Sequence, residues 1–316
     1  MTEQPPEATL WNMQRGAITT RTLAIVADLR VADALAGGPR PVEDVAREVG
    51  ADADTLHRLL RALASDGVFA EEDSGVFRNT AASELLRGDG WADFSHLFGG
   101  VWYRAVGELD ASGEAPFAPT FGTDFWSWLA AQPIERAAFD RAMVEGNEGR
   151  VERVAGLDWR GDETVVDVGG GNGSLLVELV RRRPSLRGIV FDLPETNRDE
   201  ETFGDRIQFV AGSFFGRVPE GDVYVLSTIL HDWDDEHAAN ILRVIAEAAP
   251  PHARLVILDG VIAPGNEPDG TKWLDILMLV LFRARERTEP EWRALLERGG
   301  FVPDRIEDGL IEARCR

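Results

Sequence analysis

A glycine-rich turn between a buried segment and an amphipathic segment is the feature that most constrains the fold of this chain. The segment ETVVDVG, residues 163–169, reads as a buried strand, and GSLLVELVRRR, residues 173–183, reads as an amphipathic helix. Glycines at such a junction let the backbone turn tightly and approach a ligand closely. A strand, a tight turn and a helix in this order indicate an α/β fold.

The same alternation runs through the last predicted domain, residues 161–316. The segments GIVFDL, RIQFV, GDVYVLSTIL and ARLVILDGVI read as strands, and a helix is predicted from about Asp235 to Ala248. Strands that alternate with helices form a parallel sheet with helices on both faces. We therefore predict a Rossmann-like, doubly wound α/β domain.

The first predicted domain, residues 10–95, reads as helices with little strand. A helical segment ends at Gly37-Gly38, and a short helix from Val42 to Val49 follows. A second short helix begins near Asp54, and two β-prone pieces then flank EEDSG. Helix, turn, helix and hairpin in this order are typical of a winged helix.

A winged helix can bind DNA, and a ligand-sensing DNA regulator is one alternative for this protein. DNA binding needs a basic surface, because phosphate contacts dominate the affinity. Residues 1–100 contain nine arginines and no lysine against sixteen acidic residues. This balance favours a module for packing or dimerisation.

The overall composition excludes several further classes. The net charge of −22 argues against binding to nucleic acid or to an anionic membrane surface. Cys315 is the single cysteine, so no intramolecular disulfide can form. The segment MTEQPPEATL does not resemble a signal peptide, and the apolar run LDILMLVLF is too short to span a bilayer. We expect a cytoplasmic protein.

The middle segment, residues 96–160, is rich in aromatic residues and ends in a long helical segment, residues 133–157. Aromatic residues at this density form a core or line a pocket for a flat substrate. We predict a helical linker that also contributes to a substrate pocket. The aromatic residues are Trp102, Tyr103, Phe117, Phe121, Phe125, Trp126 and Trp128.

Two patterns suggest the ligand of the glycine turn. The dinucleotide fingerprint G-x-G-x-x-G requires Gly or Ala at position 174, where this chain has Ser174. An acid followed by G-x-G-x-G, the turn used for S-adenosylmethionine, fits Asp167 and the glycines at 169, 171 and 173. Asp192 ends the next strand, where a carboxylate can accept hydrogen bonds from both ribose hydroxyls. NAD, or a tight connection without a ligand, remains an alternative.

The segment ILHDWDDEH, residues 229–237, allows a metal site, the start of a helix or a proton-transfer site. His231 and His237 are six residues apart and do not share a helical face, so helical metal ligation is disfavoured. The three acidic residues 234–236 fit the N-cap and first turn of the following helix. His231 follows a strand, so it lies at the carboxyl edge of the sheet, where ligands bind.

Together these segments resemble the S-adenosylmethionine-dependent small-molecule O-methyltransferases of bacteria and plants. The resemblance covers nearly the whole chain, and its most specific part is LHDW combined with RERT. It implies a class I methyltransferase fold, S-adenosyl-L-methionine as methyl donor, a small aromatic acceptor and a homodimer through the N-terminal domain. The motifs are FGTDFWSWLA, VVDVGGGNGS, FDLPE, GSFF, LHDWDDEHA and DILMLV with RERTEPEW.

The resemblance also implies roles for individual residues. The catalytic base falls on His231, oriented by Asp259 and Glu286, so we expect its carboxylate partners from far along the chain. We do not expect them from the acidic residues beside it. The family's cofactor-binding positions are Asp167, Gly169, Gly170, Gly171, Gly173, Asp192, Leu193, Ser213, Phe214, Ser227 and Trp233. Its acceptor-binding positions are Met143, Asn147, Asp275 and Met278; no metal is implied.

Three segments depart from the family pattern. The segment from Leu193 to Arg206 is shorter than usual, Arg283-Ala284 replaces a Gly-Gly pair before RERT, and the C-terminal hairpin is trimmed. Because of these departures, two alternatives stay open for an enzyme with this fold. It could methylate carbon or nitrogen instead of oxygen, or it could be a hydroxylase or cyclase that transfers no methyl group.

Methylation of a phenol requires a base that takes the proton of its hydroxyl group. A phenol ordinarily titrates at ~10 and imidazole at ~6.5. Full proton transfer between them would cost about 5 kcal/mol at those reference values. Carboxylates beside His231 would stabilise the imidazolium and reduce this cost.

Overall fold

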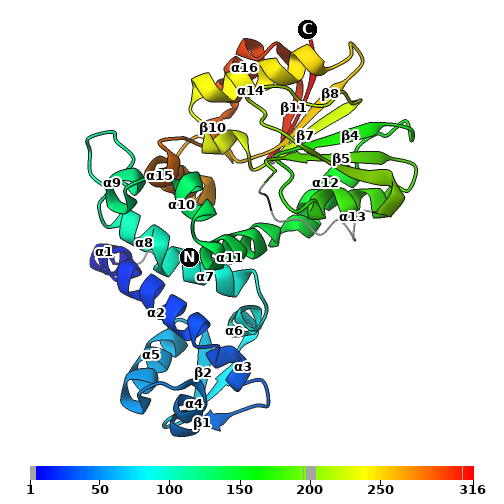
Figure 1. Ribbon diagram of the computed structural model, residues 1–316. Coiled ribbons are helices and arrows are strands. Elements are labelled where there is room, and N and C mark those ends of the chain that lie inside the picture. Colours follow the sequence, from blue (N-terminus) through cyan, green and yellow to red (C-terminus); the bar gives the residue numbers. More distant parts are fainter. Residues whose placement is uncertain (1–4, 195, 197–203, 308) are drawn as a thin grey trace. The chain divides into compact units, whose positions relative to one another are not determined.

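The computed structural model describes residues 5–194, 196, 204–307 and 309–316, which form two compact units (Figure 1). The first unit contains residues 1–108 and 126–145, and the second contains residues 109–125 and 146–316. The segment 96–160, predicted as a linker, is thus divided between the two units. Most of the short segment 193–206 lies outside the described residues.

The first unit confirms the predicted winged-helix pattern. Two short helices, α4 and α5, are followed by the hairpin β2–β3, and β1 pairs with β3. Asp52 caps α5 by accepting a hydrogen bond from the backbone N–H of Thr55. The elements are α1 (Pro6–Gln14), α2 (Gly16–Asp28), α3 (Val31–Ala34), β1 (Arg40–Pro41), α4 (Val42–Val49), α5 (Ala53–Ser65), β2 (Phe69–Asp73), β3 (Val76–Asn79), α6 (Ala81–Glu84), α7 (Trp91–Gly99), α8 (Val101–Val106), most of α10 (Phe125–Ala130), and α11 (Pro133–Val144).

Two helical segments that the sequence predicts as continuous are interrupted. The first breaks at Arg30, whose φ of 57° lies in the left-handed region, and the turn directs Val31 and Ala32 into the winged-helix core. The second breaks at Gly146, with φ 74°, between α11 and α12. In both cases, packing around the turn outweighs the helical pattern of the sequence.

The second unit confirms the predicted α/β sheet and adds an antiparallel edge. The strand order is β11-β12-β8-β7-β4-β5-β6, and β6, β5, β4, β7 and β8 run parallel. β12 is antiparallel to both β8 and β11. The strands are β4 (Thr164–Val168), β5 (Arg187–Asp192), β6 (Ile207–Ala211), β7 (Val223–Ser227), β8 (Arg254–Leu258), β9 (Val261–Ile262), β10 (Arg287–Thr288), β11 (Phe301–Glu307) and β12 (Leu310–Cys315).

Helices cover both faces of this sheet, as predicted (Figure 1). On one face the core includes Val166 with residues of α14 and α16, and on the other it includes Val165 with residues of α12 and α13. Neighbouring residues of one strand point to opposite faces, so each face receives alternate side chains. The helices are α9 (Phe117–Phe121), α12 (Asn147–Ala155), α13 (Ser174–Arg182), α14 (Asp235–Ala248), α15 (Gly270–Phe282) and α16 (Glu289–Arg298).

None of the helices in the described ranges is both long enough and apolar enough to cross a membrane.

Candidate active site

The candidate site lies at the carboxyl ends of four parallel strands of the second unit. The glycine turn follows β4, Asp192 ends β5, His231 follows β7 and Asp259 follows β8. Because parallel strands end at the same edge of a sheet, these segments from distant parts of the sequence meet there.

The glycine turn is an open cradle that residues with a Cβ atom would form only with strain. Gly169, Gly171 and Gly173 have φ of 74°, 57° and 82°, a region that L side chains rarely adopt. A Cβ atom on Gly170 would lie 2.7 Å from the carboxyl group of Asp167. A Cβ atom on Gly171 would meet nothing within 4 Å, so the backbone is open to a ligand at this residue.

Two carboxylates accompany the cradle. Asp192 accepts hydrogen bonds from the backbone N–H of Gly171 at 2.8 Å and of Leu193 at 2.6 Å, and from the hydroxyl of Thr196 at 2.9 Å. Asp167 is buried beneath the turn, and its Oδ2 has no hydrogen-bond partner among the described residues. Burial, and then the charge of Asp192, raise the pKa of Asp167 to about 7. An open backbone beside two acids fits the ribose and amino-acid end of S-adenosylmethionine.

Aromatic rings form a wall next to the segment after β7. The ring of Trp233 lies 4.7 Å from that of Phe215 and 5.9 Å from that of Phe214, measured between centroids. The two phenylalanines themselves are 5.0 Å apart. Sequence reasoning named Trp233, Phe214 and Ser213 but missed Phe215, although it belongs to the same GSFF segment.

His231 lies buried among carboxylates (7% exposed). Its Nδ1 is 2.6 Å from Oε1 of Glu286 and 3.5 Å from Oδ1 of Asp259. Oδ2 of Asp259 accepts a hydrogen bond from the backbone N–H of Leu230, which fixes this carboxylate beside the loop. The three residues named from the resemblance are thus brought together from separate elements.

The expectation that acidic residues beside His231 do not act on it is wrong for Asp232. Its Oδ1 lies 3.5 Å from Nε2 of His231, and its side chain is only 11% exposed. The short 3₁₀ turn Leu230–Asp232 directs the carboxylate back towards the imidazole ring, and no spacing rule applied to the sequence anticipates this. By contrast, Asp234 caps α14 as predicted, and His237 is exposed.

The carboxylates determine the charge of the histidine. Burial alone would lower the pKa of His231, but Asp259, Asp232 and Glu286 outweigh it and raise the pKa to about 10. Burial raises the pKa of Asp232 to about 7 and that of Asp259 to about 6, while the charge of His231 opposes both shifts. The site therefore favours an imidazolium that is paired with buried carboxylates.

Within the residues that the structure describes, no group of three or more His, Cys, Asp or Glu side chains could hold a metal ion.

The RERT segment keeps its geometry despite the departure from the family pattern. Arg283 adopts φ 59° and ends α15, so it takes the left-handed conformation that glycine would adopt there without strain. The backbone N–H of Glu286 donates to Oδ1 of Asp275 at 2.9 Å, which fixes the position of Glu286. Glu286 therefore reaches His231 without the glycine pair.

The remaining predicted site residues have varied surroundings. Asn147 donates from Nδ2 to the hydroxyl of Ser174 at 2.7 Å, next to the glycine turn. Met278 is buried in α15, and Ser227 ends β7. Met143 belongs to the first unit.

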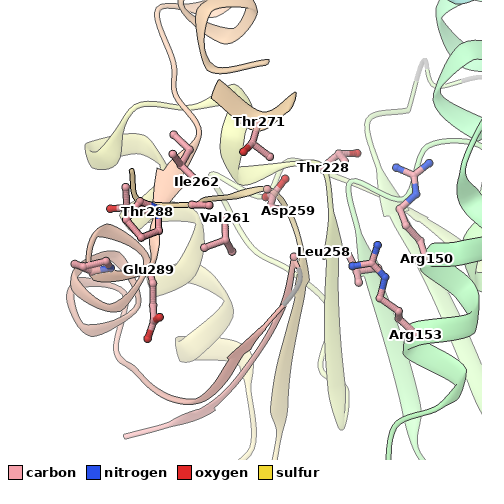
Figure 2. Close-up of a pocket in the computed structure, with 15 residues that line it drawn as sticks. Arg150, Arg153, Thr228, Leu258, Asp259, Val261, Ile262, Thr271, Thr288 and Glu289 are labelled. Atoms are coloured by element: carbon pink, nitrogen blue, oxygen red, sulfur yellow. The ribbon is translucent and has the colours of Figure 1, made fainter. Parts of the chain in front are cut away.

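A cavity of about 850 Å³ opens at the ends of β7 and β8 (Figure 2). Arg150 and Arg153 of α12 lie on one side, and Val261 and Thr288 lie on the other. Asp259, whose carboxylate lies beside His231, also lines this cavity.

Comparison with known proteins identifies the family. A model of the O-methyltransferase domain matches residues 103–302, and a model of the O-methyltransferase dimerisation domain matches residues 11–89. The chain belongs to the O-methyltransferase family. It is therefore an enzyme that depends on S-adenosylmethionine, as the resemblance implied.

Similar proteins cover nearly the whole chain. Phenazine O-methyltransferase PhzM of Lysobacter antibioticus is 38% identical over 98% of this chain and 96% of its own length. The mitomycin biosynthesis 6-O-methyltransferase of Streptomyces lavendulae is 36% identical over 95% of this chain and 90% of its own length.

Solved structures support the same fold. The crystal structure of LaPhzM has a TM-score of 0.91 and 36% identity, covering 99% of this chain and all of that one. NcsB1 from neocarzinostatin biosynthesis, in complex with S-adenosylmethionine and 2-hydroxy-5-methyl naphthoic acid, has a TM-score of 0.79 and 31% identity. That similarity covers 94% of this chain and 96% of NcsB1.

Proposed function

We propose that this enzyme methylates a phenolic hydroxyl of a small aromatic natural product, with His231 as general base. The observation that carries the proposal is the 2.6 Å contact between Nδ1 of His231 and Glu286. Glu286 is paired with Nδ1, and Asp232 lies 3.5 Å from Nε2, beyond ordinary hydrogen-bond length, so in our proposal Nε2 takes the proton of the acceptor when the imidazole is neutral. The phenazine, mitomycin and naphthoate named for the similar proteins support an aromatic acceptor.

The electrostatics of the site support a phenol. An ordinary phenol titrates near ~10, and the pKa of His231 is raised to about 10. Proton transfer from a phenol to a neutral imidazole of equal pKa is close to thermoneutral, whereas an unperturbed imidazole would face a cost of about 5 kcal/mol. At neutral pH, however, an imidazole with this pKa must first lose its own proton, which costs about 4 kcal/mol, so the proposal predicts faster methylation at alkaline pH. Asp259, Asp232 and Glu286 thus bring the pKa of the base close to that of a phenol, and they stabilise the imidazolium that forms when the proton is transferred.

Bound S-adenosylmethionine supplies an electrophilic methyl group on a sulfonium. In our proposal Asp192 and the backbone at Gly171 hold the ribose, Asp167 faces the amino-acid end, and Trp233 with Phe214 packs against the adenine. The same donor site includes Gly169, Gly170, Gly173, Leu193, Ser213 and Ser227. These residues fix the donor so that the acceptor oxygen can approach in line.

On the acceptor side we keep Met143, Asn147, Asp275 and Met278 as predicted contacts. Methionines suit a flat apolar acceptor because their side chains adapt to its shape. Asp275 also accepts a hydrogen bond from the backbone N–H of Glu286, which favours an additional role in positioning Glu286.

A panel of phenolic acceptors tests the proposal with wild type and His231→Ala. We expect one S-adenosylhomocysteine per methyl ether with wild type, and a loss of at least about a hundredfold in kcat with His231→Ala. His252→Ala, which changes an exposed histidine paired with Asp222, is the control that should keep full activity. Full activity in His231→Ala, or methylation of carbon or nitrogen, would contradict the proposal.

We also propose a homodimer through the N-terminal unit, supported by the match to the dimerisation domain. Large apolar side chains of α1 and α2 are exposed in the single chain, and a partner would cover them. They are Leu10, Trp11, Met13 and Ile18. Sedimentation equilibrium should give twice the chain mass of 34.8 kDa, whereas a monomer at micromolar concentration would contradict the proposal.

A further inference from the structure

Arg287 places a fully buried cation against the loop that carries His231 (0% exposed). Its Nη1 donates to the carbonyl of Leu230 at 2.8 Å, and its Nη2 donates to the carbonyl of Trp233 at 2.8 Å. These two carbonyls flank His231 and Asp232 on either side. The guanidinium therefore clamps both ends of the segment that carries the base.

The guanidinium is itself held in a fixed orientation. Its Nε donates to Oδ1 of Asp235 at 2.9 Å, at the start of α14. Its Cζ lies 5.4 Å from the centroid of the Trp292 ring, which stacks over the cation. A planar fork with donors in fixed directions suits these three acceptors, and the single ammonium of a lysine cannot reproduce it.

Trp292 links this arrangement to the carboxylates. Its Nε1 donates to the carbonyl of Gly260 at 2.9 Å. Gly260 follows Asp259, and a Cβ atom on Gly260 would lie 2.6 Å from Oε2 of Glu286. One connected set of contacts thus joins the His231 loop with both carboxylates that face Nδ1.

The charge of Arg287 contributes as well. The described environment of His231 contains three acidic side chains, at Asp232, Asp259 and Glu286. Burial raises the pKa of Asp259, and the charge of Arg287 acts in the opposite direction. A buried cation at this place helps to keep Asp259 ionised next to the histidine.

We propose that Arg287 is a positioning residue that fixes both the proposed base and the aromatic wall of the proposed donor site. It holds His231 against its carboxylates, and it holds Trp233 as the wall of the donor site. The inference rests on the proposed roles of His231 and Trp233, and it predicts that the base and the donor affinity depend on one side chain.

Arg287→Lys in the full-length enzyme tests the proposal, because it keeps the charge and removes the fork. We expect the Kd of S-adenosylhomocysteine, measured by titration calorimetry without acceptor, to rise by about tenfold. We expect kcat at saturating donor to fall by about a hundredfold, because a small displacement of the base is enough for such a loss. An arginine with only a structural role would lower Tm and leave Kd and kcat of the folded protein within twofold, which would overturn the proposal.

Asp235→Asn keeps the test decisive if Arg287→Lys does not fold. It weakens the contact to Nε and the longer, exposed ion pair with Arg285, so we expect about a threefold change in both Kd and kcat, in line with one weakened hydrogen bond. Unchanged values would overturn the proposal. Arg285→Met is the matched control, since exposed Arg285 lies 3.8 Å from the same Asp235 and should leave Kd and kcat unchanged.

His231→Ala, measured in parallel, separates this inference from the proposed function. Full activity in His231→Ala would remove the role of His231 as base. An unchanged Kd in Arg287→Lys beside an inactive His231→Ala would overturn only the positioning role of Arg287.

Discussion

The proposed donor side and the proposed base side of the site are built in different ways. The donor side uses backbone geometry, with a glycine turn and the carboxylate of Asp192 at the ends of neighbouring strands. The base side uses charge, because His231 is buried among three acidic side chains from three separate parts of the sequence. Changes on the donor side should therefore alter binding, and changes on the base side should alter the rate.

The largest expected effect is on the base side. Glu286→Gln removes the charge that faces Nδ1 of His231, and we expect kcat to fall by about a thousandfold or more. The Kd of S-adenosylhomocysteine should stay within twofold. Glu289→Gln, at a half-exposed residue three positions on, is the control. A rise in Kd as large as the fall in kcat would contradict the separation of the two sides.

The reverse pattern is expected on the donor side. Asp192→Asn removes a charged acceptor for the ribose hydroxyls, and we expect the Kd of S-adenosylhomocysteine to rise by about ten- to a hundredfold. The kcat at saturating donor should change little. Asp205→Asn is an exposed control close by in sequence. A large loss of kcat with unchanged Kd would break the comparison.

Asp232 tests how charge on the base side controls pH dependence. A neutral His231 is needed to accept a proton, so kcat/KM for a phenol should rise with pH through neutrality towards about 10. Asp232→Asn removes an anion that raises the pKa of His231, so its rising limb should move to lower pH, by about one unit. Asp234→Asn should not move it, because asparagine caps a helix equally well. If the rising limb of the pH profile stays in place in Asp232→Asn, Asp232 does not raise the pKa of His231.

Arg283 gives the smallest effect and concerns stability. Its left-handed conformation is strained for any residue with a Cβ, and its ion pair with Glu114 is exposed on both sides. We expect Arg283→Gly to stabilise the fold by about 0.5–1 kcal/mol and raise Tm by about two degrees. Ala284→Gly, at a buried residue, should instead lower Tm. A lower Tm in Arg283→Gly would show that the arginine contributes more than its strain costs.

Local patterns in the sequence were enough to predict the elements that form the proposed donor side. The strand, the glycine turn and Asp192 follow from hydrophobic patterning and from the conformational freedom of glycine, which depend on neighbouring residues. The base side needed the family resemblance to connect His231 with Asp259 and Glu286. Asp232 and Arg287 were missed because their roles depend on the direction of a single 3₁₀ turn and on contacts between distant segments. The break at Arg30 was missed because packing of the next turn overrides helix propensity.

The pKa of His231 is the most direct test of the proposed base side. Protein labelled with ¹³C at Cε1 of its five histidines can be titrated by NMR, with His231→Gln and His96→Gln to assign the signals. The His96 control is needed because Asp28 and Glu135 also raise the pKa of that residue to about 10. Our account predicts that His231 stays protonated through neutral pH and titrates near 10. Titration at or below the ordinary value of about 6.5 would contradict it.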